Sequence, residues 1–248
     1  MPVDPRLVYI DMKTRRAQFH LDALEVVVQD WIDSNPHTVT HYDNFQKAIH
    51  IVRIEDEIAP ELIPMLVGDF VCCLRAALDQ LAWALAHLPP VRTFTEAEER
   101  RIQFPIFKID DDRCRKLLSF FPTAVASELD LLQPYRSGSA YRDNPLWQLN
   151  ELWNMDKHRS IPVNCTSFNL HFPFHGWERY LHHFTNAVEV HFPLVTFYQS
   201  PVNLEPNIAV EVLFGEHMGN FEVSLERLAE INDFVRDDII PRFAGFFT

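Results

Sequence analysis

The segment Gly68–Leu88 constrains the fold most, because it is long, almost entirely apolar and contains neither Gly nor Pro after its first residue. Its Leu, Ala, Val, Phe and Trp content predicts a buried helix, which Pro89-Pro90 ends. At 100° per residue, its polar side chains share about one third of the circumference. They are Asp69, Cys72, Arg75 and Asp79. Because a polar stripe on a buried helix needs partners, it is either a structural ion pair between Arg75 and Asp79 or one wall of a polar site.

Charge and composition argue against several classes of protein. The 248 residues carry a net charge of −13, which weakens long-range attraction to a nucleic-acid backbone but leaves room for a local basic groove. Gly occurs only 6 times, and neither the phosphate-binding motif G-x-x-x-x-G-K nor the dinucleotide-binding motif G-x-G-x-x-G is present. The charges within Ile58–Leu88 argue against a membrane span, and the N-terminus has no signal-peptide pattern. The sequence therefore indicates no cofactor and no membrane association.

The four cysteines are too scattered for a zinc site or a disulfide framework. Only Cys72 and Cys73 are close, and neighbouring residues on a helix point about 100° apart. We therefore expect buried free thiols in a reducing cytoplasm.

Hydrophobic periodicity predicts helices on both sides of a hairpin. Ala17, Leu21, Leu24, Val28 and Trp31 recur at helical spacing within Lys13–Asp33, and Asn35-Pro36 ends that helix. The hairpin is formed by His37–Tyr42 and Gln46–Ile54, with Asp43-Asn44 at the turn. Beyond the buried helix we expect a capping box at Thr95-x-x-Glu98 and an extended segment at Phe104–Phe107 that docks on the core. Further helices are expected at Asp111–Phe121, at Pro122–Leu132 and, after the cap Asn144, from Pro145 to Arg159.

The last third of the chain changes to strand patterns. Strands are predicted at Val163–Phe172, Asn186–Thr196 and Asn207–Phe214, followed by an amphipathic helix over Phe221–Phe243. These elements predict an α+β fold: a helical bundle core with an antiparallel sheet formed by the N-terminal hairpin and the C-terminal strands. No linker is evident, so we expect one domain over residues 1–248, with the helical core at about 60–161 and the late strands and last helix at 163–248. The alternative is a helical bundle beside a separate small sheet.

The helix Pro145–Ile161 carries a second set of polar residues. Asn150, Asn154 and His158 follow one another at i, i+4 and i+8, while Asp156 falls on the apolar side and should be paired, with Arg75 or Lys157 as candidates. The helix dipole favours protonated His158, which suits an acid or base at neutral pH. Alternatively, Asp156, Lys157, His158 and Arg159 form an ordinary charged helix end. Five histidines further along the chain, at 171, 175, 182, 183 and 191, lack a metal-binding spacing or accompanying acids, so no metal site is predicted.

Four segments together resemble a family of uncharacterised bacterial proteins. They are Gly68-Asp69 with Leu74-Arg75-x-Ala77-Leu78-Asp79-x-Leu81, Phe104-Pro105-Ile106, Leu132-Gln133-Pro134-Tyr135, and Leu149-Asn150-Glu151-Leu152-x-Asn154-x-Asp156-Lys157-His158-Arg159. The resemblance extends over most of the chain and implies no activity. Cys72, Cys73 and Gln80 stand where the family pattern has His, Asn and His.

A shorter resemblance is to the HEPN superfamily of helical domains, many of them ribonucleases. Its signature on one helix is Arg, a polar residue, three residues and His, which Asn154 and His158 match, whereas Trp153 stands where the Arg belongs. The resemblance implies that His158 and a guanidinium act on RNA, often across a homodimer, and Arg75 or Arg159 could replace the missing Arg.

Three functions are consistent with these patterns. The first is a HEPN-like ribonuclease or RNA-binding protein of bacterial defence or toxin type. Its catalytic candidates are His158, Asn154, Arg75, Asp79 and Asp156, and its ligand-binding candidates are Lys157, Arg159, Asp69 and Asn150. The second is a non-catalytic ligand- or protein-binding module in which the same residues are structural. The third is a small-molecule enzyme with His158 as acid or base and Asp156 or Asp79 orienting it. The aromatic content exceeds what one core of this size requires, which is consistent with a homodimer.

Overall fold

The computed structural model describes residues 4–34, 37–56, 58–89, 92–164, 169–171, 181–184, 187–193, 207–209, 212–216 and 221–247. The fold is α+β, as predicted. The residues group into two compact units, each assembled from separate stretches of the chain. The helical unit comprises residues 1–25, 64–162 and 225–248, and the sheet unit comprises residues 26–63 and 163–224. The chain crosses between the units four times: within the helix Pro5–Asp33, within the helix Leu62–Ala86, between residues 162 and 163, and between residues 224 and 225.

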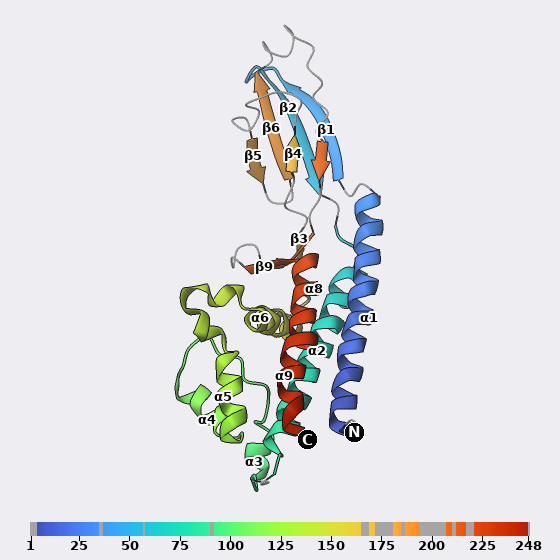
Figure 1. Cartoon of the computed structure of the whole chain (residues 1–248). Coiled ribbons are helices and arrows are strands. Elements are labelled where there is room, and N and C mark those ends of the chain that lie inside the picture. The colour runs from blue at the N-terminus through green and yellow to red at the C-terminus, as the bar shows by residue number, and fades with distance from the viewer. Residues whose placement is uncertain are drawn as a thin grey trace. The chain divides into compact units, whose positions relative to one another are not determined.

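The helical unit is built from two long helices, several short ones and a segmented C-terminal helix. The elements are α1 (Pro5–Asp33), α2 (Leu62–Ala86), α3 (Glu96–Glu99), α4 (Asp112–Leu118), α5 (Thr123–Leu131), the 3-10 segment η1 (Pro134–Asp143), α6 (Pro145–His158), α8 (Leu225–Asp233), the π-helical segment η4 (Phe234–Ile239), α9 (Ile240–Ala244) and the 3-10 turn η5 (Gly245–Phe247). α1 and α2 continue into the sheet unit by a few residues. Figure 1 shows α1, α2, α8 and α9 running side by side, with α6 across them.

The helical core forms where periodicity predicts it. The five α1 residues predicted to face inward are all buried, although the helix begins at Pro5 rather than Lys13. α2 is almost completely buried along one side, including Val67, Phe70, Leu74 and Leu78. On the C-terminal helix, Leu228, Val235 and Ile239 are buried as expected, and Leu225 is half-buried. Apolar burial on this scale is the main stabilising contribution to such a unit.

Both predicted helix caps are present. Thr95 and Glu98 form the reciprocal bonds of a capping box, and the Asn144 side chain accepts hydrogen bonds from the backbone N–H groups of Leu146 and Trp147. Between these helices the extended segment at Phe104 docks on the core, with its Phe104 side chain fully buried. Arg75 and Asp79, two of the predicted site residues, contact this segment.

The sheet unit contains the predicted hairpin. Strands β1 (His37–Asn44) and β2 (Ile49–Asp56) pair antiparallel, with the turn two residues later than predicted and Ala48 at φ 51° within it. β6 (Ala187–Pro193) pairs with β2, and β5 (Leu181–Phe184) with β6, giving the order β1-β2-β6-β5 (Figure 1). The hairpin and a C-terminal strand therefore share one antiparallel sheet, as expected. Val188, Val190 and Phe192 are buried on one face of β6.

Other late strands differ from the prediction. The stretch predicted as one strand over Asn207–Phe214 contributes to two sheets: β7 (Asn207–Ala209) pairs with β4 (Asn169–His171), and β8 (Leu213–Glu216) pairs with β3 (Val163–Asn164) and β9 (Phe221–Ser224). The last helix begins at Leu225 rather than Phe221, because residues 221–224 pair as a strand. Alternating apolar residues fix a strand but not its partner, which is why sequence alone joined two strands into one.

Within the described part of the chain, no helix is long and apolar enough to span a bilayer.

Candidate functional site

The polar stripe of α2 divides into a buried and an exposed part. Arg75 is 2% exposed and Asp79 is half-buried, whereas Asp69 and Cys72 are exposed. The prediction of buried thiols is therefore wrong for Cys72, while Cys73 is half-buried and Cys114 is buried. Cys165 lies outside the described residues. The predicted stripe exists, but its members do not share one environment.

Arg75 and Asp79 together hold the extended segment at Phe104. The Arg75 guanidinium lies 2.9 Å (Nη2 to Oδ1) from Asp79 and donates a hydrogen bond of 2.9 Å to the Phe104 carbonyl. Asp79 in turn accepts a hydrogen bond of 2.9 Å from the Phe104 N–H. Both backbone polar groups of Phe104 are thus satisfied by one ion pair, which is what a buried extended segment requires. Burial lowers the pKa of Arg75, and the Asp79 carboxylate opposes that shift.

Trp153, on α6, packs its ring against the Arg75 guanidinium of α2. The Arg75 guanidinium carbon lies 4.8 Å from the centroid of the Trp153 ring, and the Lys157 ammonium lies 3.0 Å from it. Cation–π contacts of this kind stabilise by about 0.5–2 kcal/mol each, more when the cation is desolvated. The HEPN signature would require an arginine at residue 153. The Trp153 ring found there contacts the Arg75 guanidinium and supplies no guanidinium of its own.

Asp156 lies against Gly68 and makes no ion pair among the described residues. A β-carbon placed on Gly68 would come 2.4 Å from Oδ1 of Asp156, so the absence of a side chain at residue 68 leaves room for the Asp156 carboxylate. Burial and the nearby Asp69 carboxylate raise the pKa of Asp156. The expected partners are engaged elsewhere, Arg75 by Asp79 and Lys157 by Trp153, so the expected pairing of Asp156 is wrong.

Asp69 faces a buried histidine on α1. Nδ1 of His20 lies 3.8 Å from Oδ2 of Asp69, and Nε2 of His20 receives a hydrogen bond of 3.0 Å from Arg16. Burial lowers the pKa of His20, an effect that Asp69 opposes and Arg16 reinforces. The neutral form of the His20 imidazole is thereby favoured, and Asp69 takes part in the contact between α1 and α2.

The polar residues of α6 face solvent. Asn154 and His158 are exposed and Asn150 is half-buried, and the side chains of these three residues form no hydrogen bond or ion pair within the described part of the chain. Lys157 and Arg159 at the helix end are exposed as well. The structure thus places Asn154 and His158 on an accessible face, separate in environment from the closed Arg75 site.

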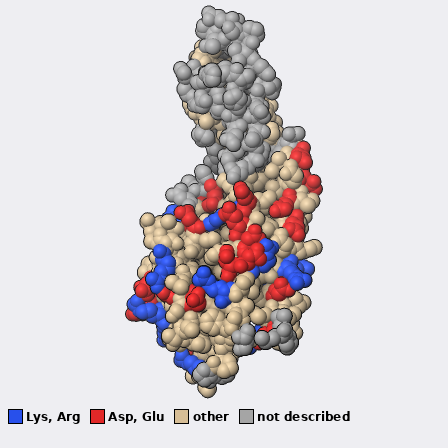
Figure 2. Space-filling model, viewed as in Figure 1, with Lys and Arg blue, Asp and Glu red and all other residues tan. Residues whose placement is uncertain are grey.

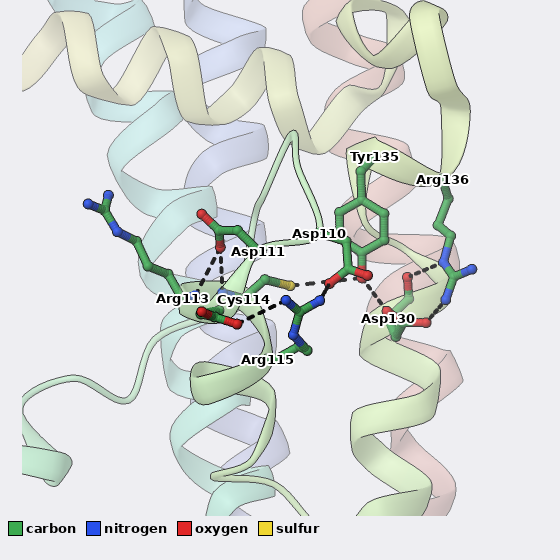
Figure 3. A network of polar contacts seen from close by, with 9 residues as sticks. Asp110, Asp111, Arg113, Cys114, Arg115, Asp130, Tyr135 and Arg136 are labelled. Atoms are coloured by element: carbon green, nitrogen blue, oxygen red, sulfur yellow. Dashed lines mark hydrogen bonds and ion pairs between the residues drawn. The ribbon is translucent and has the colours of Figure 1, made fainter.

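A second polar network holds the following residues of the extended segment, Pro105 and Phe107. The Gln133 carboxamide is fully buried, donates to the carbonyls of Pro105 and Leu129, and accepts a hydrogen bond of 3.0 Å from the Phe107 N–H. Beside it, Tyr135 donates to Asp130, which also pairs with Arg136 (Figure 3). Both networks therefore support residues 104–107.

Figure 3 also shows the Cys114 thiol directed toward the Tyr135 hydroxyl, 3.8 Å away. Burial, followed by the contact with Cys114, raises the pKa of Tyr135. Burial also raises the pKa of the Cys114 thiol. A thiol and a phenol that both stay protonated at neutral pH are suited to packing rather than to nucleophilic attack.

Sequence reasoning missed a polar cluster on one face of the four-stranded sheet. Glu189, 6% exposed, accepts hydrogen bonds from Arg53 (2.8 Å) and Tyr42 (3.3 Å) and lies 2.7 Å from Nε2 of His191. The ring of His182 stacks on that of His191, with centroids 4.1 Å apart. Burial tends to raise the pKa of Glu189, but His191, Arg53 and Tyr42 outweigh it, so that the pKa lies below 4.5.

The expectation that no acid accompanies the histidines is therefore wrong for His191. The alternation of β6 puts Glu189 and His191 on one face, and this was the available signal; the register of β6 against Arg53 could not be foreseen. No group of three or more His, Cys, Asp or Glu side chains within the described part of the chain could hold a metal ion.

Comparison with known proteins gives no relative. No family model matches the chain, and neither a curated protein nor a solved structure is similar to it.

Proposed function

We propose that this protein is a non-catalytic binding module, in which the polar residues of α2 and α6 hold the helical unit together. The observation that carries the proposal is the state of Arg75. Its guanidinium is closed to solvent, bonded to Asp79 and to the Phe104 carbonyl, and covered by Trp153. A guanidinium that stabilises a phosphate during RNA cleavage must reach that phosphate. The Arg75 guanidinium could do so only after breaking its buried ion pair with Asp79.

The charge of the surface supports the same conclusion. On the face seen in Figure 2, Lys and Arg side chains are interspersed with Asp and Glu and form no continuous basic area among the described residues. With a net charge of −13, electrostatic attraction to a nucleic acid is weak. A module of this kind in the cytoplasm would bind a protein or a small ligand rather than RNA.

A second candidate, the HEPN-like ribonuclease, is favoured by one observation. Asn154 and His158 are exposed one helical turn apart, with Lys157 and Arg159 beside them at the end of α6. In this candidate His158 would act as acid or base and Arg159, rather than Arg75, would meet the phosphate.

A ribonuclease assay on single-stranded and structured RNA separates the two. We expect no cleavage by the wild-type protein, and we expect His158→Ala to change the free energy of unfolding by no more than about 0.5 kcal/mol, because the side chain is exposed. His182→Ala, which removes an exposed histidine of the sheet unit, is the matched control. Cleavage that disappears in folded His158→Ala and persists in His182→Ala would replace our proposal with the ribonuclease.

A further inference from the structure

One face of α1 carries a line of exposed apolar side chains opposite the face that is buried in the core. Val8, Met12, Phe19 and Val26 are 45%, 58%, 58% and 61% exposed. At 100° per residue they lie within about 40° of one another, roughly opposite the buried Ile10, Ala17, Leu21 and Leu24. We call these four residues the α1 stripe. A helix that is apolar on two opposite faces has a second surface suited to a partner.

The charges of α1 are divided along its length. Residues 5–18 carry four basic and one acidic side chain, a net charge of +3, and residues 19–33 carry four acidic and no basic ones, a net charge of −4. The helix dipole favours the reverse order, with acids in the first turn and bases in the last, and α1 has neither. The stability of the helix itself therefore does not account for the arrangement.

An antiparallel copy of the same helix does account for it. Placed side by side in opposite directions, two such helices bring the basic half of each against the acidic half of the other, and their apolar stripes meet between them. A parallel arrangement would instead place like charges together. From these charges and the α1 stripe, we infer that two copies of this chain associate through α1, antiparallel, about a two-fold axis near Phe19.

The spacing of the stripe fits this symmetry. Met12 and Val26 each lie seven residues from Phe19, so when the two Phe19 rings meet on the axis, Met12 of one copy comes level with Val26 of the other. A two-fold interface requires such self-complementarity, in which residue i meets residue j and j meets i. The aromatic ring on the axis would be the buried anchor of the interface.

The flanking charges fit as well. Arg15 lies four residues before Phe19 and Asp22 three residues after it, on the same edge of the α1 stripe at 100° per residue. In the antiparallel pair, Arg15 of one copy comes within one residue of the level of Asp22 of the other, twice by symmetry. Arg15 is 79% exposed and holds only Asp11 of its own helix among the described residues, so it is accessible to the second copy. The inference concerns α1 alone and is independent of the role proposed for α2 and α6.

Sedimentation equilibrium on the full chain tests the association. We expect a dimer for the wild type and at least a tenfold weaker association for Phe19→Glu, while Phe45→Glu, which charges a more exposed ring in the sheet unit, leaves the dimer intact. A wild type that is monomeric at about 100 µM, or a Phe19→Glu protein that dimerises as tightly as wild type, would overturn the inference.

A charge exchange tests the orientation. Arg15→Glu and Asp22→Arg should each weaken the dimer, because each places like charges together, and the double variant should recover the wild-type dissociation constant to within about threefold. Two weakened single variants without recovery in the double variant would overturn the antiparallel arrangement. Disulfide formation between copies of Phe19→Cys in a Cys72→Ser background provides an independent readout, since Cys72 is exposed. Failure of Phe19→Cys to cross-link under oxidation, with the protein folded, would overturn the placement of Phe19 on the axis.

Discussion

The two units each contain an arginine–carboxylate pair, but the buried partner differs. In the helical unit the Arg75 side chain is 3% exposed and that of Asp79 is 32% exposed, whereas in the sheet unit the Glu189 side chain is 8% exposed and that of Arg53 is 35% exposed. An arginine cannot lose its charge in a protein, while a buried carboxylate can take up a proton. The same kind of pair therefore has different consequences when its more exposed member is removed.

The largest effect is expected for Asp79→Ala. The substitution leaves the Arg75 guanidinium buried and charged without its carboxylate, and it removes the acceptor of the Phe104 N–H. Loss of one partner of a buried pair costs about 3 kcal/mol, a value at the lower end of the usual range because Asp79 is partly exposed. Urea denaturation at pH 7 measures this change in the free energy of unfolding. Gln80→Ala, at an exposed polar residue of the same helix, is the control and should change stability by no more than about 0.5 kcal/mol.

Equal stabilities for Asp79→Ala and Gln80→Ala would remove the basis for treating the Arg75 pair as structural. The proposal of a binding module would then lose its principal support, and a ligand that completes the Arg75 site would have to be sought.

A smaller and pH-dependent effect is expected for Arg53→Met. Arg53 is partly exposed, and Glu189 keeps its bonds to His191 and Tyr42, so the loss at pH 7 should be about 1 kcal/mol. The pKa of Glu189 lies below its ordinary value of 4.5, so its ionised form adds stability above that pH, and this stability is lost as the pH falls through the lowered pKa. The difference between the variant and the wild type should therefore shrink below about pH 4.5.

Urea denaturation of both proteins across the acid range measures this difference. A stability loss that stays constant from neutral to acid pH would mean that Arg53 acts through packing of its side chain rather than through the Glu189 charge.

The two pairs also differ in whether the sequence predicts them. Arg75 and Asp79 are four residues apart on a helix, so their pairing follows from helical geometry, as do the caps at Thr95 and Asn144. Arg53 and Glu189 are 136 residues apart, and only the register of β2 against β6 brings them together. Alternation predicts which residues share a face of a strand but not which strand lies beside it, and this also explains why residues 207–214 were assigned to one strand.

Periodicity groups the polar residues of each helix but does not give their environments. It could not show that Arg75 and Asp79 contact Phe104 and Trp153, whereas Asn154 and His158 face solvent. That distinction depends on a segment that arrives from another part of the chain, and its contacts are set by tertiary packing.

The smallest effect, and the one most specific to the contact of α2 with α6, concerns Gly68. Alanine is favoured over glycine within a helix by about 1 kcal/mol, but a β-carbon at residue 68 would lie 2.4 Å from Oδ1 of Asp156. Since the three nearest atoms all belong to the Asp156 carboxylate, Gly68→Ala should stabilise the protein by about 0.5–1 kcal/mol in an Asp156→Ala background and be neutral or destabilising in the wild type. Thermal or urea unfolding of the four proteins in this double-mutant cycle gives the coupling energy. A coupling of zero would mean that the Asp156 side chain turns away without cost, and that the close approach of the two helices does not depend on the glycine.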